Sequence, residues 1–419
     1  MSEKIPFVIS FPSHWQEIPN RYLFVYDGTK VGEQSSEYQL LSLTTAGIRE
    51  KDIGTGGGKV PTSYDNYQTV KKGQMVFCLF DLDCSAVFSG ISNYDGMITS
   101  AYDVFSSTGR ITNRFADYWF KYVFSKRYYK MFSKNIRYTI TGDMFRSICT
   151  PVPPKSEQEA IALCLQKEEE AIDSLIANQE AQIEKLKAYK QSLITEVVTK
   201  GLDPTVPMKD SGVEWIGEIP EKWMVLKLKY ITTISRGLFN HRPRNDPGLY
   251  GGDFPFIQTG DVARSTKYIT SYSQTLNELG ASVSKQFSKG TMTMTIAANV
   301  GDVAILGFDA YFPDSVVGFT VKEGYDENYV YYLFRALKQS FINASIVSTQ
   351  LNLNIERAKE ILISATTNKD EQIRIAEYLD KKCSDIDRLI ALKQSKIEKL
   401  NEYKKSLIYE YVTGKKEVV

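Results

Sequence analysis

Apolar residues recur at steps of three and four through two long stretches of this chain, 157–199 and 371–413. Such a pattern gives a helix one apolar stripe and is typical of a coiled-coil seam. A helix of about 43 residues is about 65 Å long if it is unbroken. The predicted seam residues are Ile172, Ile176, Ile183, Leu186, Leu193 and Val197 in the first stretch, and Ile386, Ile390, Ile397, Leu400, Leu407 and Tyr411 in the second.

The two stretches are copies of each other. Aligned without a gap at a constant offset of 214 residues, they are identical at 23 of 43 positions. This period is far too long for a solenoid, so it indicates a twofold duplication of a large unit. Both copies interrupt the stripe at equivalent places, first at Gln179 and Lys393 and then at Lys190 and Lys404. Polar seam positions of this kind often set the register of a helix pair.

The starts of both helices carry capping signals. Ser156 and Asp370 occupy equivalent positions and are predicted N-caps, and Ser156 forms a capping-box pattern with Glu159. Because a long helix with one apolar stripe needs a partner, we expect the two copies to form an antiparallel pair. The alternative is two separate helices, each packed on its own domain.

The segments before the helices are also related, but weakly. The first segment opens with "FPSHW" (11–15) and the second with "IPEKW" (219–223). Each segment then contains short alternating runs and a predicted aromatic helix, at 116–124 in the first and at 327–337 in the second. The runs predict strands joined by turns. We therefore predict an α+β fold with two pseudo-symmetric domains and two helices. The predicted boundaries are 1–154 and 201–368 for the domains, and 155–200 and 369–419 for the helices.

Composition excludes several classes of protein. No run of about 18 apolar residues predicts a membrane helix, and the first residues do not resemble a signal peptide, so a cytoplasmic location is expected. Five scattered cysteines and two histidines argue against a disulfide framework and a zinc site. The net charge of +1 leaves any nucleic-acid contact to local patches.

Catalytic motifs are not found. "GTGGGKV" (54–60) lacks the Ser or Thr that follows the lysine of a P-loop, so it is interpreted as a glycine-rich loop, with contact to DNA phosphates as the alternative. The GxSxG and HExxH motifs are missing as well. We therefore predict that this chain has no catalytic residues of its own.

Local charge gives the first candidate binding surface. Residues 110–137 hold eight basic side chains and one acid, with aromatic residues between them. We interpret this stretch as a helix with one packed face and one phosphate-binding face, and the alternative is a solvated face. The candidates are Arg110, Arg114, Lys121, Lys126, Arg127, Lys130 and Lys134.

A second candidate surface lies in the loop "RGLFNHRPRND" (236–246). Arginine contacts guanine edges and asparagine or glutamine contacts adenine edges through paired hydrogen bonds. An ordinary polar surface loop is the alternative. The candidates in and near this loop are Arg236, Asn240, His241, Arg242, Arg244, Gln258 and Arg264.

These features together resemble the specificity subunit of type I restriction-modification enzymes. The resemblance rests on "DSGVEWIGEIPEKWMVLKLKYI" (210–231), on "EQIRIAEYLDKKCSDIDRLI" (371–390) and on "IEKLNEYKKSLIYEYVTG" (397–414), with their first-half copies.

The resemblance implies two target-recognition domains, each reading half of a bipartite double-stranded DNA target. It also implies that the helices act as an antiparallel spacer on which two methyltransferase subunits dock, with restriction subunits as possible further partners. S-adenosylmethionine, ATP and Mg²⁺ would then belong to those partners, with no cofactor or metal in this chain.

Two other classes of function stay open at the level of sequence. A coiled-coil adaptor that scaffolds protein partners would show no DNA-dependent stabilisation. An enzyme with an unrecognised site would show activity from the purified chain alone. The target sequence cannot be derived, since these domains carry no residue-to-base code.

Overall fold

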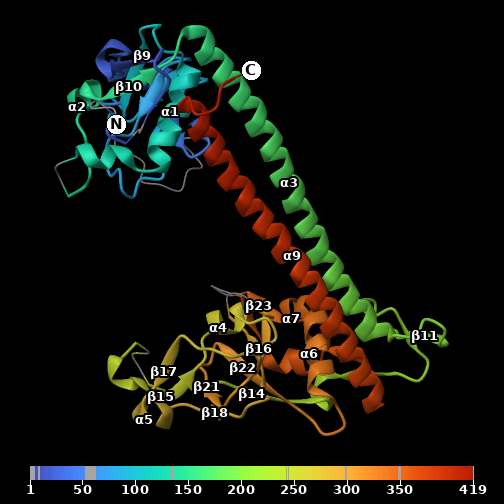
Figure 1. The fold of residues 1–419 in the computed structure, drawn as a ribbon. Coiled ribbons are helices and arrows are strands. Elements are labelled where there is room, and N and C mark those ends of the chain that lie inside the picture. Colours follow the sequence, from blue (N-terminus) through green and yellow to red (C-terminus); the bar gives the residue numbers. More distant parts are fainter. Residues whose placement is uncertain are drawn as a thin grey trace. The chain divides into compact units, whose positions relative to one another are not determined.

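The computed structural model describes residues 5–7, 10–51, 63–133, 136–241, 243, 245–297, 300–347 and 351–418 (Figure 1). The chain divides into two compact units. The first unit comprises residues 1–180 and 394–419, and the second comprises residues 181–393. The first is therefore discontinuous in sequence, whereas the second is one continuous segment.

The first unit combines short strands with helices. Its strands are β1 (Gln16–Pro19), β2 (Phe24–Tyr26), β3 (Leu41–Thr44), β4 (Gly47–Glu50), β5 (Gln68–Val70), β6 (Met75–Phe77), β7 (Ser89–Ile91), β8 (Gly96–Ile98), β9 (Asp103–Ser107) and β10 (Cys149–Val152). Its helices are α1 (Asn113–Ser125), α2 (Gly142–Ser147) and the short 3-10 helices η1 (Asn20–Tyr22), η2 (Gly32–Glu37) and η3 (Tyr128–Phe132), with parts of α3 (Lys155–Lys200) and α9 (Lys369–Val412).

The second unit has more strands. They are β11 (Met208–Asp210), β12 (Glu218–Pro220), β13 (Met224–Lys227), β14 (Thr232–Arg236), β15 (Tyr250–Phe256), β16 (Tyr268–Ile269), β17 (Gln274–Leu276), β18 (Gln286–Phe287), β19 (Met292–Thr295), β20 (Val303–Leu306), β21 (Ala310–Tyr311), β22 (Val316–Val321), β23 (Ser345–Val347), β24 (Leu351–Leu353) and β25 (Leu362–Ala365). Its helices are α4 (Thr259–Arg264), α5 (Glu278–Ser282), α6 (Glu327–Ala336), α7 (Lys338–Asn343), α8 (Ile355–Lys359), η4 (Leu228–Tyr230) and η5 (Pro247–Leu249), with the remaining parts of α3 and α9.

The central sheets of the two units have the same topology. The order is β2-β9-β6-β7 in the first unit and β14-β22-β19-β20 in the second, where β16 is added at the edge. All pairs within the common four strands are antiparallel. The aromatic helices occupy equivalent places, since α1 lies against β7 and α6 lies against β20. The duplication seen in the long helices therefore extends to the sheets.

Each unit is also closed by a two-stranded ribbon. In the first unit β1 pairs with β10, the strand that precedes α3, and in the second β13 pairs with β25, the strand that precedes α9. Both ribbons are antiparallel and connect the start of a globular segment with its end. The predicted connector 201–220 is more structured than expected, because β11 and β12 form a hairpin within it.

The four common strands, the two-stranded ribbon and the long helix form a frame that both units share. The units differ in the strands outside this frame. The first has the hairpin β3–β4 and the pair β5–β8. The second has a separate four-stranded sheet of order β17-β15-β21-β18, drawn in yellow and orange in Figure 1. The segments outside the four common strands have therefore diverged.

The predicted helix pair is present and antiparallel. Within the first unit the early part of α3 packs against the late part of α9, where Ile161, Leu165 and Ile172 share a core with Leu407 and Val412. Within the second unit the late part of α3 packs against the early part of α9. The predicted α+β architecture with two paired long helices is confirmed.

Two local predictions were wrong. The N-cap of α9 is Asn368 instead of Asp370, because the Asn368 side chain accepts hydrogen bonds from the backbone N–H groups of Asp370 and Glu371. At α3 the predicted cap, Ser156, already lies inside the helix, which begins at Lys155. The predicted capping box therefore does not start this helix.

The basic stretch 110–137 is not one continuous helix. Helix α1 ends at Ser125, and Arg127 adopts a left-handed conformation with φ of 53° before the turn η3 begins. A left-handed residue interrupts a right-handed helix. Basic residues on either side of Arg127 consequently do not share one helix face.

Candidate nucleic-acid interface

A tryptophan–carboxylate pair anchors each globular segment to its long helix. The Trp15 indole N–H donates to Glu157 Oε1 at 3.0 Å, and the Trp223 indole N–H donates to Glu371 Oε1 at 3.2 Å. Both tryptophans are buried. Glu157 and Glu371 are equivalent in the 214-residue repeat, so this contact is duplicated with the frame.

A buried glutamine follows each anchor carboxylate and orients the aromatic helix. Gln158 accepts from the backbone N–H of Thr112, the N-cap of α1, while donating to the carbonyls of Arg110 and Pro153. Gln372 accepts in the same way from Asp326, the N-cap of α6. The helices α1 and α6 therefore start from the same position on the frame.

A tyrosine on each aromatic helix makes a second contact to a long helix. Tyr118 donates to Glu169 of α3 at 2.9 Å, and Tyr332 donates to Asp380 of α9 at 2.6 Å. Burial and the adjacent carboxylate together raise the pKa of both tyrosines well above the ordinary value. Both phenols therefore remain protonated donors at neutral pH.

The second polar interruption of the seam, at Lys190 and Lys404, forms matched ion pairs. In the second unit Lys190 lies 2.6 Å from Asp387, and in the first unit Lys404 lies 2.9 Å from Asp173. Lys190 and Lys404 are equivalent in the repeat, as are Asp173 and Asp387. One pair is thus the repeat equivalent of the other, and each pair links α3 to α9.

The predicted seam residues lie at these helix contacts with little exposure. The buried ones are Ile172, Ile183, Leu193, Val197, Ile386, Ile397, Leu407 and Tyr411. The partly buried ones are Ile176, Leu186, Ile390 and Leu400.

Several predicted phosphate-binding residues of the first unit have partners within the protein. Lys121 lies 3.1 Å from Asp117 and 4.0 Å from Glu169. Although burial alone lowers it, these two carboxylates raise the pKa of Lys121. Arg127 stacks over the Phe124 ring and donates to a backbone carbonyl, and Lys130 lies over the Tyr138 ring.

Three other candidates in this stretch are more available. Arg110, Arg114 and Lys126 are exposed, and none of them forms an ion pair within the described part of the chain. Lys134 lies outside the described residues, as does the glycine-rich loop 54–60. The predicted cationic face is therefore smaller than the sequence suggested.

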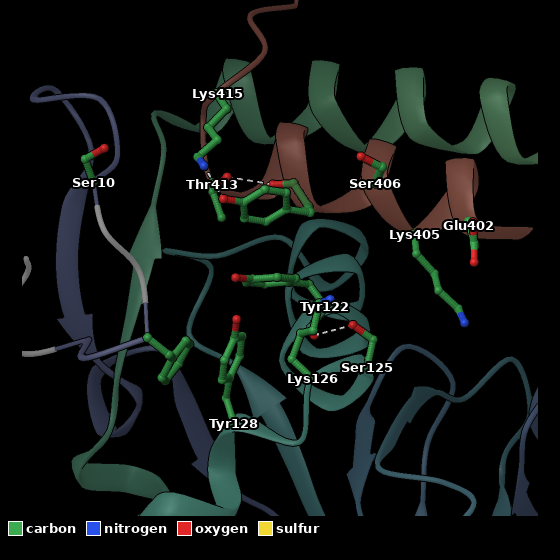
Figure 2. A pocket seen from close by; sticks show the side chains of 12 residues that line it. Ser10, Tyr122, Ser125, Lys126, Tyr128, Glu402, Lys405, Ser406, Thr413 and Lys415 are labelled. Atoms are coloured by element: carbon green, nitrogen blue, oxygen red, sulfur yellow. Dashed lines mark hydrogen bonds between the residues drawn. The ribbon is translucent and has the colours of Figure 1, made fainter. Parts of the chain in front are cut away.

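A cavity of about 650 Å³ adjoins the end of α1 (Figure 2). Its lysines come from two elements, with Lys126 from the C-terminal end of α1, and Lys405 and Lys415 from α9 and the residues after it. Tyr122 packs against Tyr409 here, with ring centroids 5.2 Å apart. The cavity places Lys126 beside lysines that the sequence did not connect with it.

A second cavity, of about 780 Å³, runs beside α1 on the side of Arg114. It is lined by acids as well as bases, including Asp117, Glu169 and Asp173 together with Lys121 and Lys404. Because opposite charges are interspersed along it, this groove as a whole is not a cationic path to a phosphate backbone, and its exposed Arg114, which forms no ion pair in the described part of the chain, remains the candidate phosphate contact here.

The described candidates of the second unit have different local environments. His241 lies 3.1 Å from Asp246, and Asn240 holds its loop through a backbone hydrogen bond to Val283. Arg236 ends β14 and is exposed. Arg264 pairs with the buried Asp261. Arg242 and Arg244 lie outside the described residues.

Gln258 precedes α4 and lies near this loop across a cavity of about 440 Å³. The cavity also contains Asn245, Tyr250 and Gln274, which sequence reasoning did not select. Gln274 starts β17 and pairs with Phe256 of β15, so only the strand pairing brings it to Gln258. No local sequence pattern marks Gln274 or Asn245 as members of this cavity.

In the described part of the chain no cluster of three or more His, Cys, Asp or Glu side chains is arranged to hold a metal ion. A search of the same residues finds no helix with the length and apolar character needed to cross a membrane.

Comparison with known proteins shows what this chain is similar to. Residues 220–402 match the model of the type I restriction modification DNA specificity domain. The type I restriction enzyme MjaVIII specificity subunit of Methanocaldococcus jannaschii is 27% identical over 285 residues, covering 65% of this chain and 63% of that protein. The MjaIX specificity subunit of the same organism is 29% identical over 192 residues, covering 45% of this chain and 43% of that protein. The matches thus span less than two thirds of either relative.

Solved structures support the same fold. A chain from the structure described as "Structural basis underlying complex assembly and conformational transition of the type I R-M system" has a TM-score of 0.73 at 12% identity, covering 97% of this chain and 99% of that chain. The HsdS subunit from Thermoanaerobacter tengcongensis has a TM-score of 0.51 at 13% identity, covering 96% and 98%. The expected resemblance to type I specificity subunits is confirmed, and residues 220–402 are the part of the chain that matches the DNA specificity domain model.

Proposed function

We propose that this chain is the DNA sequence-specificity subunit of a type I restriction-modification complex. Each globular segment, 1–154 and 201–368, acts as a target-recognition domain for one half of a bipartite double-stranded DNA target. The paired helices, 155–200 and 369–419, set the spacing of the half-sites and dock two methyltransferase subunits.

The observation that carries this proposal is a common frame combined with unlike loops. The anchors Trp15–Glu157 and Trp223–Glu371, the sheet order and the seam ion pairs are duplicated. The strands outside the central sheets differ between the units. A protein that reads two different half-sites needs this combination, since specificity comes from base contacts and positioning comes from the frame.

The chain acts without catalysing a reaction. S-adenosylmethionine would be bound by the methyltransferase subunits, and ATP and Mg²⁺ by restriction subunits where these are present. The complex acts in the cytoplasm on cellular and incoming DNA. Support comes from the match of residues 220–402 to a DNA specificity domain and from the names of the relatives.

The test is co-expression of this chain with the methyltransferase encoded beside it, followed by mapping of N6-methyladenine in host DNA with long reads. A split motif with a fixed spacer, present only when this chain is present, is expected. A stable complex that methylates no motif would contradict the proposal and favour the coiled-coil adaptor. Activity of the purified chain alone would favour an enzyme.

A further inference from the structure

The cavity between β15, β17 and the loop before α4 has an aromatic wall and an amide rim. Phe239, Tyr250 and Phe256 form the wall, with ring centroids 5.3 to 6.2 Å apart. Gln258 and Gln274 lie at the rim. None of the described lining residues is acidic. The site is therefore suited to a flat, uncharged group with hydrogen-bonding atoms on its edge.

The hydrogen bond between the two amides leaves most of the hydrogen-bonding capacity of Gln274 unused. Gln258 Nε2 donates to Gln274 Oε1 at 3.0 Å. Gln274 then retains both N–H donors of its amide and one lone pair on its oxygen. Its Nε2 has no hydrogen-bond partner in the described part of the chain. A donor and an acceptor thus remain side by side on one amide.

The buried Asp261 carboxylate supports the positions of the two glutamines. Asp261, whose side chain is 1% exposed, accepts from the Gln258 backbone N–H at 2.8 Å and from Ser273 Oγ at 3.1 Å. Ser273 directly precedes Gln274, and Gln274 is paired with Phe256 in the sheet. The same carboxylate therefore holds the Gln258 backbone and the Ser273 side chain next to Gln274, which reduces the conformational entropy lost when a ligand binds.

We propose that Gln274 reads an adenine in the major groove of the half-site addressed by the second unit, and that Gln258 is its positioning residue. An amide with a free donor and a free acceptor matches adenine N7 and N6. The aromatic wall offers apolar contact to the methyl group of the paired thymine. This inference rests on the proposed function and extends it to one base pair.

The test uses the full chain in complex with its methyltransferase and a library of double-stranded oligonucleotides with a randomised half-site. Gln274→Ala is expected to lose the preference for adenine at a single position by about tenfold to a hundredfold. Gln274→Glu keeps the shape but has only acceptors, so the preferred base at that position is expected to change to cytosine, whose N4 is a donor. Gln258→Ala is expected to weaken the same preference without changing the preferred base.

Gln286→Ala is the matched control, because Gln286 is exposed on β18 of the same small sheet and does not line the cavity. Thermal unfolding of each variant identifies any that fail to fold. If Gln274→Ala does not fold, the base preference of the isosteric Gln274→Glu tests the role of Gln274. Unchanged base preference in folded Gln274→Ala and Gln274→Glu would overturn this inference alone. A wild-type complex without any base preference would overturn the proposed function together with it.

Discussion

The two units share a frame but differ in the parts attached to it. Both have a central sheet with the same order of four antiparallel strands, an anchor tryptophan, a buried glutamine that orients an aromatic helix, and a lysine in the seam. The first unit carries two small strand pairs, whereas the second carries a four-stranded sheet with an amide-lined cavity. Contacts that connect domain to helix have thus been retained in both copies, while surfaces that face outward have changed.

The largest effect is expected at the anchor tryptophans. Trp15→Ala and Trp223→Ala each remove a buried indole and its hydrogen bond, and each is expected to cost about 3–5 kcal/mol of unfolding free energy. If the frame is truly duplicated, the two losses should agree within about 1 kcal/mol. Urea unfolding followed by far-UV circular dichroism measures both. A large loss in one unit and a small loss in the other would refute the equivalence.

The next effect concerns the buried glutamines. Gln158→Leu and Gln372→Leu leave the N-cap N–H of Thr112 or Asp326 without its acceptor, which is expected to cost about 1–3 kcal/mol in each unit. Gln166→Leu is the control, since Gln166 is on α3 but is exposed. Hydrogen exchange should show the loss of protection at the start of α1 or α6. Protection retained in either helix would mean that other contacts fix its start.

The third prediction compares the contributions of two basic residues of α1 to DNA binding. Arg114 is exposed without an ion pair in the described chain, whereas Lys121 is paired with Asp117. Arg114→Ala is expected to weaken DNA binding whatever the sequence and to lower the slope of log K against log salt by about 0.9. Lys121→Ala is expected to leave that slope unchanged. Titration at several salt concentrations measures both slopes, and the reverse result would place the phosphate backbone on the other side of α1.

The smallest effect is expected at the seam. Lys190→Met and Lys404→Met each remove a partly exposed ion pair while keeping most of the aliphatic stem, so each should cost about 0.2–1 kcal/mol. The two costs should be similar, and both should shrink in 1 M salt, where charges are screened. Unfolding curves at two salt concentrations test this. Unequal values would show that the two halves of the helix pair are not energetically alike.

Much of the frame was predictable because it occurs twice. The seam, the antiparallel pair and the aromatic helices followed from periodicity and from the 214-residue repeat. Glu157 with Glu371 and Gln158 with Gln372 are identical repeat positions at the helix starts, so their shared role was also accessible from the alignment.

The remaining features depend on backbone detail or on contacts between distant segments. The break at Arg127 comes from one left-handed residue within a run whose composition favoured a helix. Asn368 was missed as a cap because the signal at Asp370 is equally good in composition. Gln274 meets Gln258 only through the pairing of β17 with β15, and no local pattern reports such a pairing.

The discontinuity of the first unit has a consequence for synthesis of the protein. Domains generally fold as units while the chain emerges from the N-terminus. The second unit needs only residues 181–393, but the first also needs residues 394–419, which follow the whole second unit in the chain. The core around Ile161, Leu165 and Ile172 is complete only when Leu407 and Val412 have been synthesised and pack against it. The first unit is therefore completed only after the whole second unit has been synthesised, and until then the apolar face of its part of α3 lacks its α9 partner.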